Sequence, residues 1–452
     1  MAADSQILAG LGSKAITPRE PIQMSGFARS QMSTGVHDDL YAKSLYLEDG
    51  AGRKAFLIAV SLIYLTPELV ESIRAEIARR TGADPGSVIF SCTHTHAGPA
   101  LAADFYTAPT PGTYPSYLVS QVAASAEAAY LDRRPSRIGF GRTEVFEMGR
   151  NRRALLYGGL HPDPEVLVMK IEDAGGNLRG VAFNYGCHPS TLDWQNTLIS
   201  EDWPHYTHAE IMKKCAMGGG EIWSAYLQGA QGDINCGYSS ELSAVGVDMP
   251  IRNYEFIAKK GRQLAAVVLG ALPGIQTESR LDVSLASGLF DYPLRKEYPV
   301  TPDEAARDAE EAKAKLTEME KNPAFAGTRR LDEARVRVFS TSQRLAVARR
   351  RKEKGWVPFL KIEHQALRVG KAVFLTIPGE VFSEIGLRIK AESRYDWTFL
   401  LGIANGTGTS GYLPPAKEFI QGDYEVDGCI YEPSAEDVMV AACRDVMKRV
   451  GG

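Results

Sequence analysis

The sequence lacks several features that would place it in a specialised class of protein. Its six cysteines are scattered without a Cys-x-x-Cys pair, and no apolar run reaches the ~18 residues of a transmembrane helix. The first residues, Met1–Gln6, lack the basic and apolar stretches of a secretory signal. We therefore expect a cytoplasmic protein with free thiols, because disulfides are rare in reducing compartments.

An excess of charge of one sign is also missing. The 51 Lys and Arg residues nearly balance the 55 Asp and Glu residues, giving a net charge of −4. This balance argues against a general affinity for nucleic acid or for anionic membranes. The hydrophobic fraction of 44% and the charged fraction of 23% are those of an ordinary globular protein.

What is present is an alternation of β-rich and helical segments. The apolar run Lys54–Tyr64 is followed by the amphipathic Pro67–Thr81 and then by the β-rich Val88–Cys92. This alternation predicts an α/β fold, with a layered mixed β-sheet core flanked by helices. Further expected strands are Val166–Ile171, Gly180–Tyr185, Ala372–Ile377 and Thr398–Ile403.

One segment has a different composition. Residues 301–354 are rich in Ala, Glu, Lys and Arg, and they open with the helix-start pattern Thr301–Glu304. Asn322-Pro323 interrupts the segment near its middle. We predict a solvated helical hairpin inserted into a single domain that spans residues 1–452; a coiled-coil partner site is much less common for such a segment.

Three histidines directly follow expected strands. His94 and His96 come after Val88–Cys92, and side chains two apart on a continued strand project to the same side. Imidazole is a frequent zinc ligand, and a second ring can shuttle protons. A hydrogen-bonded pair that caps the sheet is an equally good interpretation. His188 follows Gly180–Tyr185 at the carboxyl end of the strand, where open α/β sheets place their sites, although a lone histidine is more often structural.

Other polar residues give weaker individual signals. Glu380 lies in the turn after Ala372–Ile377, where an acid stabilised by a helix dipole is the more common interpretation. Tyr412 and Tyr424 lie beyond the next expected strand, and loop tyrosines usually pack. The segment Gly149–Arg153 suits an anionic or carbonyl group, or a solvated turn.

In this order the segments resemble the catalytic domain of the neutral/alkaline non-lysosomal ceramidases. The segment Thr93–Pro99 looks like the T-H-T-H-[SA]-[GA]-P box of that family. The resemblance runs from about residue 8 to about residue 435. The other matching segments are Gly10–Pro18, Gly35–Asp39, Asn151-Arg152, Cys187–Pro189, Pro378–Glu380, Gly411-Tyr412 and Tyr424.

The resemblance implies a zinc site with two imidazoles, one carboxylate and one phenolate. The phenol ligates as phenolate because the cation stabilises its charge. The resemblance also implies that His96, Arg152 and Tyr424 surround the reacting carbonyl, and that His37 and Asn235 bind substrate. The implied zinc ligands are His94, His188, Glu380 and Tyr412.

The function expected from this resemblance is zinc-dependent hydrolysis of an amide (N-acyl) bond by a metal-activated water. Tyr424 and Arg152 would stabilise the oxyanion, and His96 would move a proton to the leaving group. Asn235 stands at the position of a family serine, so a covalent serine route is not available there. The alternatives are hydrolysis of another polar bond, in an ester or a sugar conjugate, and a catalytically silent binding protein. The expected partner is a small or lipid-like acylated substrate, and homo-oligomerisation stays open.

Overall fold

The computed structural model describes most of the chain. The described residues are 6–27, 32–101, 112–153, 159–216, 221–237, 252–296, 301–326, 328–406, 411–422 and 424–451.

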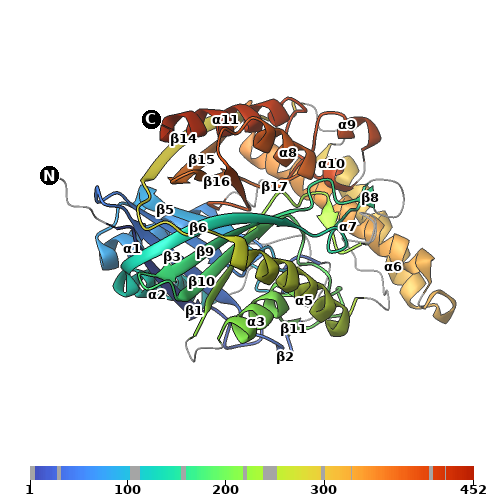
Figure 1. Cartoon of the computed structure of the whole chain (residues 1–452). Helices are drawn as coiled ribbons and strands as arrows, with labels where there is room; N and C mark the ends of the chain where they lie inside the picture. Colours follow the sequence, from blue (N-terminus) through green and yellow to red (C-terminus); the bar gives the residue numbers. More distant parts are fainter. Residues whose placement is uncertain are drawn as a thin grey trace.

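An eight-stranded mixed sheet is the larger of the two main sheets (Figure 1). Its strand order is β12-β10-β9-β6-β1-β3-β4-β5, and its parallel pairs, β10 with β12 and β4 with β5, lie at the two ends. Its strands are β1 (Leu8–Ala15), β3 (Tyr41–Glu48), β4 (Lys54–Val60), β5 (Val88–Cys92), β6 (Arg134–Glu144), β9 (Glu165–Asp173), β10 (Leu178–Tyr185) and β12 (Trp223–Gln228).

A four-stranded sheet in the order β14-β15-β16-β18 packs against it. Short ladders of two-residue strands complete the β-structure. The strands of the second sheet are β14 (Val283–Pro293), β15 (Phe359–Val369), β16 (Ala372–Ile377) and β18 (Trp397–Gly402). The short ladders consist of β2 (Gly35–Val36) with β11 (Leu198–Ile199), of β7 (Arg150–Asn151) with β8 (Gly159–Leu160) and β13 (Ile234–Asn235), and of β17 (Glu380–Val381) with β19 (Tyr412–Leu413).

Helices cover the outer faces of both sheets. Helices α1 and α2, and further along α3 and α5, pack on the larger sheet, while α8 and α11 lie along the smaller one (Figure 1). The helices are α1 (Pro67–Thr81), α2 (Tyr114–Asp132), α3 (Trp203–Cys215), α5 (Tyr254–Ala271), α6 (Pro302–Glu320), α7 (Arg329–Lys354), α8 (Ser383–Ala391), α9 (Glu418–Gln421), α10 (Tyr424–Asp427) and α11 (Ala435–Val450), with 3₁₀ turns η1 (Pro85–Ser87), η2 (Leu272–Gly274) and η3 (Pro323–Phe325). Among the described residues, none of these helices has the length and apolar character needed to cross a membrane.

Both faces of the larger sheet are buried, as the alternation along β4 illustrates. Phe56 and Ile58 join the apolar cluster under α1 and α2, whereas Leu57 joins a cluster with Phe374 and Phe399 of the second sheet. Successive side chains of a strand point to opposite faces, so β4 contacts a helical layer on one side and a sheet on the other. The protein therefore has four layers: helices, the larger sheet, the smaller sheet and further helices. This arrangement confirms the predicted layered mixed sheet flanked by helices.

The predicted helical hairpin is also confirmed. Helix α6 begins with a capping box, in which Thr301 and Glu304 bond each other's backbone N–H groups. Helix α7 returns along α6 after the turn at Pro323–Phe325. Arg344 of α7 donates to Asp427 of α10 at 2.7 Å, and Arg335 lies over the ring of Trp194 at 4.6 Å.

The larger sheet brings its two edges near each other. Edge strands β5 and β12 are in contact, and β18 of the second sheet contacts both. At the end of β12, Gln228 Nε2 donates to the carbonyl oxygen of Thr93, just beyond β5, at 3.0 Å. The segments that follow β5, β10, β12 and β16 therefore meet in one region, which contains most of the candidate site residues.

Candidate metal centre and active site

His94 lies just after β5 in an uncommon backbone conformation. Its φ of 71° is in the left-handed region, which costs a non-glycine residue energy and is found most often at functional sites. Its N–H donates to Leu62 O at 2.8 Å, and its ring Nδ1 lies 2.8 Å from Ile63 O. With a proton on Nδ1, the Nε2 atom keeps its lone pair for another partner. This buried Nε2 forms no hydrogen bond with the described residues. A metal-ligating histidine has this arrangement.

His188 is held in the same way. It is fully buried, and its Nδ1 lies 2.8 Å from Gln231 O and 3.0 Å from Ile234 O. Burial, reinforced by the positive charge of Arg152, lowers the pKa of His188 to about 4. The ring is therefore neutral near pH 7, and neutral imidazole is the form that binds metals.

Both imidazoles converge on one carboxylate oxygen. Glu380 Oε2 lies 2.9 Å from His188 Nε2 and 3.3 Å from His94 Nε2. Burial alone would raise the pKa of Glu380, but the two histidines outweigh it and hold this pKa well below its usual range. Gly379, with φ of 84°, makes the turn that brings the carboxylate here from the end of β16.

Tyr412 is placed by the two-residue ladder between β17 and β19. It lies directly opposite Glu380, whose N–H donates to Gly411 O at 3.0 Å. Its hydroxyl accepts a hydrogen bond from Arg152 Nη2 at 3.0 Å, and its ring centroid is 5.5 Å from that of Tyr424. Burial, with Glu380 adding to it, raises the pKa of Tyr412 well above its usual value. A bound cation acts in the opposite direction and favours the phenolate.

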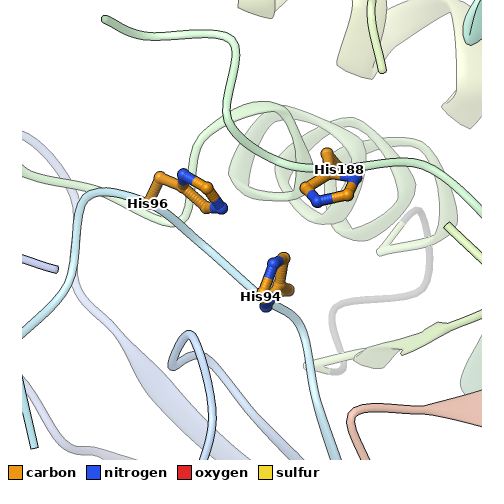
Figure 2. A group of neighbouring side chains, drawn as sticks. All are labelled: His94, His96 and His188. Atoms are coloured by element: carbon orange, nitrogen blue, oxygen red, sulfur yellow. The ribbon is translucent and has the colours of Figure 1, made fainter. Parts of the chain in front are cut away.

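His96 joins the same group. Figure 2 shows its ring beside those of His94 and His188, and one nitrogen of each lies within 4.8 Å of the others. The ring centroid of His96 lies 5.0 Å from that of His94 and 5.8 Å from that of His188. The sequence predicted a proton-transfer role for His96; the geometry also makes it a candidate third imidazole ligand.

Gly26 is a site residue that sequence reasoning missed. Its φ is 94°, and an added Cβ would lie 2.5 Å from the ring of His96. Phe27 packs edge-on against the same ring, with centroids 5.0 Å apart. Nothing in the sequence near Gly26 indicates this contact, because it arises between segments that are distant along the chain.

His37, a predicted substrate-binding residue, lies in a different cluster. Its Nδ1 is 2.8 Å from Asp38 Oδ2, and its ring stacks on that of Tyr254 at 3.9 Å. Within the described part of the chain, no contact joins His37 to His94 or His188. Asp38, Glu201 and His205 form a second group of potential ligand atoms, but Asp38 is already bonded by Ser200 Oγ and the N–H of Glu201.

Asn235, the other predicted substrate-binding residue, is completely buried in β13. Its backbone lies opposite Arg150 of β7, and its side-chain oxygen accepts from the N–H of Gly237 at 2.8 Å. The substrate-binding roles of His37 and Asn235 stay predictions.

The donor set fits a divalent zinc ion. Two imidazole nitrogens, a carboxylate and a phenol are borderline-to-hard ligands of the kind that zinc takes. The buried Nε2 of His94, which has no hydrogen-bond partner among the described residues and lies 3.3 Å from Glu380 Oε2, supports this fit.

Comparison with known proteins agrees with this geometry. Residues 7–237, which include His94 and His188, match the family model described as neutral/alkaline non-lysosomal ceramidase, N-terminal. The chain belongs to this ceramidase family. The family resemblance seen in the sequence is thereby confirmed.

Curated members of the ceramidase family match part of the chain. Neutral ceramidase of Pseudomonas aeruginosa is 27% identical over 220 residues, which cover 43% of this chain and 32% of that protein. Neutral ceramidase A of Dictyostelium discoideum is 25% identical over 258 residues, or 51% of this chain and 36% of that protein. The matched part is thus about a third of the length of these relatives.

Solved ceramidase structures share the fold over nearly the whole chain. The crystal structure of neutral ceramidase from Pseudomonas aeruginosa superimposes with a TM-score of 0.71 at 19% identity, covering 99% of this chain and 75% of that one. A ceramidase complexed with C2 gives a TM-score of 0.73 at 18% identity, covering 99% and 76%. The fold of the ceramidases therefore includes the elements that carry Glu380 and Tyr412.

Proposed function

We propose that this ceramidase-family chain is a zinc-dependent hydrolase that cleaves the amide bond of an N-acyl substrate. The observation that carries the proposal is the convergence of two imidazole nitrogens on one oxygen of Glu380, beside Tyr412. The curated relatives, which are neutral ceramidases, support an amide as the scissile bond.

We propose that the metal is held by Glu380, by the two histidines that contact it, and by the phenol opposite it. A bound zinc ion supplies Lewis acidity, which activates water and polarises a carbonyl group. The residues that would hold it are His94, His188, Glu380 and Tyr412.

Two further residues would act on the reacting groups. Burial raises the pKa of Tyr424, so its phenol stays protonated and can donate a hydrogen bond to the acyl oxygen as negative charge develops there. His96 lies in the same group of rings and would pass a proton to the leaving nitrogen. Arg152, whose side chain is 1% exposed, would act on the site through its bond to the Tyr412 hydroxyl.

Metal content gives the first test. We expect about one zinc per wild-type chain by elemental analysis, and its loss in both His188→Ala and Glu380→Ala. Glu384→Ala is the matched control, since Glu384 lies on α8 near Glu380 but pairs with the exposed Lys417. A wild type that holds no metal and takes up none from added zinc contradicts the proposal.

Turnover gives the second test. N-acyl amines with short and long acyl chains, N-acylsphingosine among them, are incubated with the zinc-loaded enzyme, and the released amine and fatty acid are measured. We expect release of the amine and the fatty acid that depends on zinc and disappears in His188→Ala. Turnover of esters or sugar conjugates alone would favour the alternative hydrolase, and absence of all turnover by zinc-loaded enzyme would favour a binding protein.

A further inference from the structure

The short helix α10 carries two neighbouring residues with different surroundings. Tyr424 faces the ring of Tyr412, and the next residue, Glu425, is completely buried. Glu425 Oε1 accepts from Arg152 Nε at 2.9 Å, and Oε2 accepts from Arg153 Nη1 at 2.6 Å. A buried carboxylate is costly unless it is paired and hydrogen-bonded, and here each oxygen has its own arginine.

A second nitrogen of the Arg152 guanidinium group is bonded to the active site. Its Nη2 donates to the Tyr412 hydroxyl at 3.0 Å and to Gly232 O at 2.8 Å. Because a guanidinium is planar and rigid, a partner on Nε determines where its Nη groups point. Glu425 therefore controls the direction from which Arg152 reaches the Tyr412 oxygen.

Arg153 does not depend on Glu425 in the same way. It has a second carboxylate partner, Glu418, at 2.9 Å from its Nε, and a further bond to Gly422 O. The side chain of Glu418 is 20% exposed, whereas that of Glu425 is fully buried. Glu418 thus shares the contact with Arg153 but has no described bond to Arg152.

We propose that Glu425 is a positioning residue for amide hydrolysis: through Arg152 it orients the Tyr412 hydroxyl toward Glu380 and the two histidines. This role rests on the proposed function. The carboxylate of Glu425 bonds Arg152, which in turn bonds the Tyr412 hydroxyl, so its positioning effect passes through the guanidinium. The same carboxylate also ties α10 to the segment after β7, which keeps Tyr424 beside Tyr412.

The test compares Glu425→Gln with the matched control Glu418→Gln. The glutamine keeps the size of the side chain but loses its charge and one acceptor. For Glu425→Gln we expect kcat per bound zinc to fall about tenfold or more with KM within about twofold, because misplacing a group at the reacting centre affects the transition state most. For Glu418→Gln we expect both constants within about twofold of wild type.

A spectroscopic measurement separates positioning from a merely structural role. Cobalt(II) is substituted for zinc, and its visible bands report the geometry of the ligands. We expect bands that shift in Glu425→Gln and stay unchanged in Glu418→Gln. If Glu425→Gln only melts at a lower temperature, with wild-type kcat and wild-type bands, the proposal is overturned.

Three further outcomes are distinguishable. If Glu425→Gln does not fold, Glu425→Asp, which keeps the charge but is one methylene shorter, takes its place; shifted bands support the proposal and wild-type values overturn it. A wild type without turnover whose cobalt bands nevertheless shift in the variant rejects the proposed function and retains the positioning role. A wild type that binds neither metal overturns both.

Discussion

At the residue scale, the three neighbouring imidazoles differ in what holds them. His94 and His188 each have Nδ1 against backbone carbonyl oxygens, which fixes the tautomer and points Nε2 at Glu380. His96 instead packs against Phe27 and the α-carbon of Gly26. The first two are therefore oriented as ligands, while the position of His96 depends on how closely Gly26 approaches it.

This dependence predicts a strong effect of Gly26→Ala. The methyl group would meet the His96 ring at 2.5 Å, and φ of 94° is unfavourable for alanine. We expect kcat to fall about 10- to 100-fold, since small displacements of a catalytic group are costly, with zinc content retained. Gly52→Ala is the control, because Gly52 also has a positive φ, 76°, but a Cβ added there would meet no atom within 4 Å. Equal activities in the two variants would contradict the assignment.

A second residue-scale prediction concerns His364, which lies outside the site. It is fully buried against the Tyr292 hydroxyl, and burial lowers its pKa to about 4. The unfolded chain, with an ordinary histidine pKa near ~6.5, binds this proton first as the pH falls. His364 thus favours folding above pH ~6.5, and this contribution is lost as the pH falls toward ~4.

The measurement is the free energy of unfolding in denaturant at pH 7 and pH 4.5, for wild type and His364→Gln. Between these two values of pH, wild type is expected to lose about 2 to 3 kcal/mol more than the variant. Other titrating groups contribute equally to both proteins and cancel in the difference. Identical losses would show that folding does not lower the pKa of His364.

At the element scale, the sequence predicts best those elements whose ends are marked by nearby residues. Helix α1 has its predicted bounds, because Thr66 caps its first turn and Gly82, with φ of 69°, ends it. Strands β5 and β16 also have their predicted bounds. The ladder between β17 and β19 was not predicted, since two residues per strand carry no periodic pattern and the pairing depends on a contact between distant segments.

The same distinction, between features marked by local sequence and features that depend on distant contacts, applies to the site. The motif resemblance predicted the residues that the structure brings together around Glu380, with His96, Arg152 and Tyr424 close to them. It did not predict Gly26 or Glu425, because their importance lies in contacts with His96 and Arg152 made across the fold. His37 matches a family segment and stacks on Tyr254, and its substrate-binding role stays a prediction.

Asp233 is predicted to hold several of these short elements together. Its carboxylate accepts from Asn151 Nδ2 at 2.7 Å, from Ser383 N–H at 2.7 Å and from Ser383 Oγ at 2.8 Å. In Asp233→Asn the new NH₂ group faces a donor, so we expect a loss of about 1 to 3 kcal/mol in the free energy of unfolding. Asp291→Asn, which removes an exposed ion pair with Lys361, should cost less than about 1 kcal/mol. Similar losses in both variants would argue against this role.

At the scale of the whole molecule, the candidate metal centre joins the two sheets. His94 and His188 follow strands of the larger sheet, whereas Glu380 and Tyr412 follow strands of the smaller one. A ligand that binds only the folded state stabilises it, by about 2.7 kcal/mol at a free concentration of 100 Kd. The bound ion would therefore stabilise the packing of one sheet on the other as well as the chemistry.

Removal of the metal should accordingly lower the melting temperature. We expect a chelator to shift thermal unfolding of wild type down by a few degrees, and added zinc to restore it. His188→Ala should melt at the lower temperature from the outset and respond to neither treatment. A wild type whose melting temperature is unaffected by the chelator, after its zinc has been shown to leave, would contradict a role of the ion in stability.

The division of the site between the sheets also has a consequence for biosynthesis. The ribosome adds roughly 5 to 20 residues per second, so Tyr412 follows His188 after a delay on the order of ten to forty seconds. For most of that interval the nascent chain contains both histidines but neither Glu380 nor Tyr412, and the phenol is the last of the four donors to be added. Metal capture with the full set of four donors must therefore wait until Tyr412 has been synthesised and has left the ribosome.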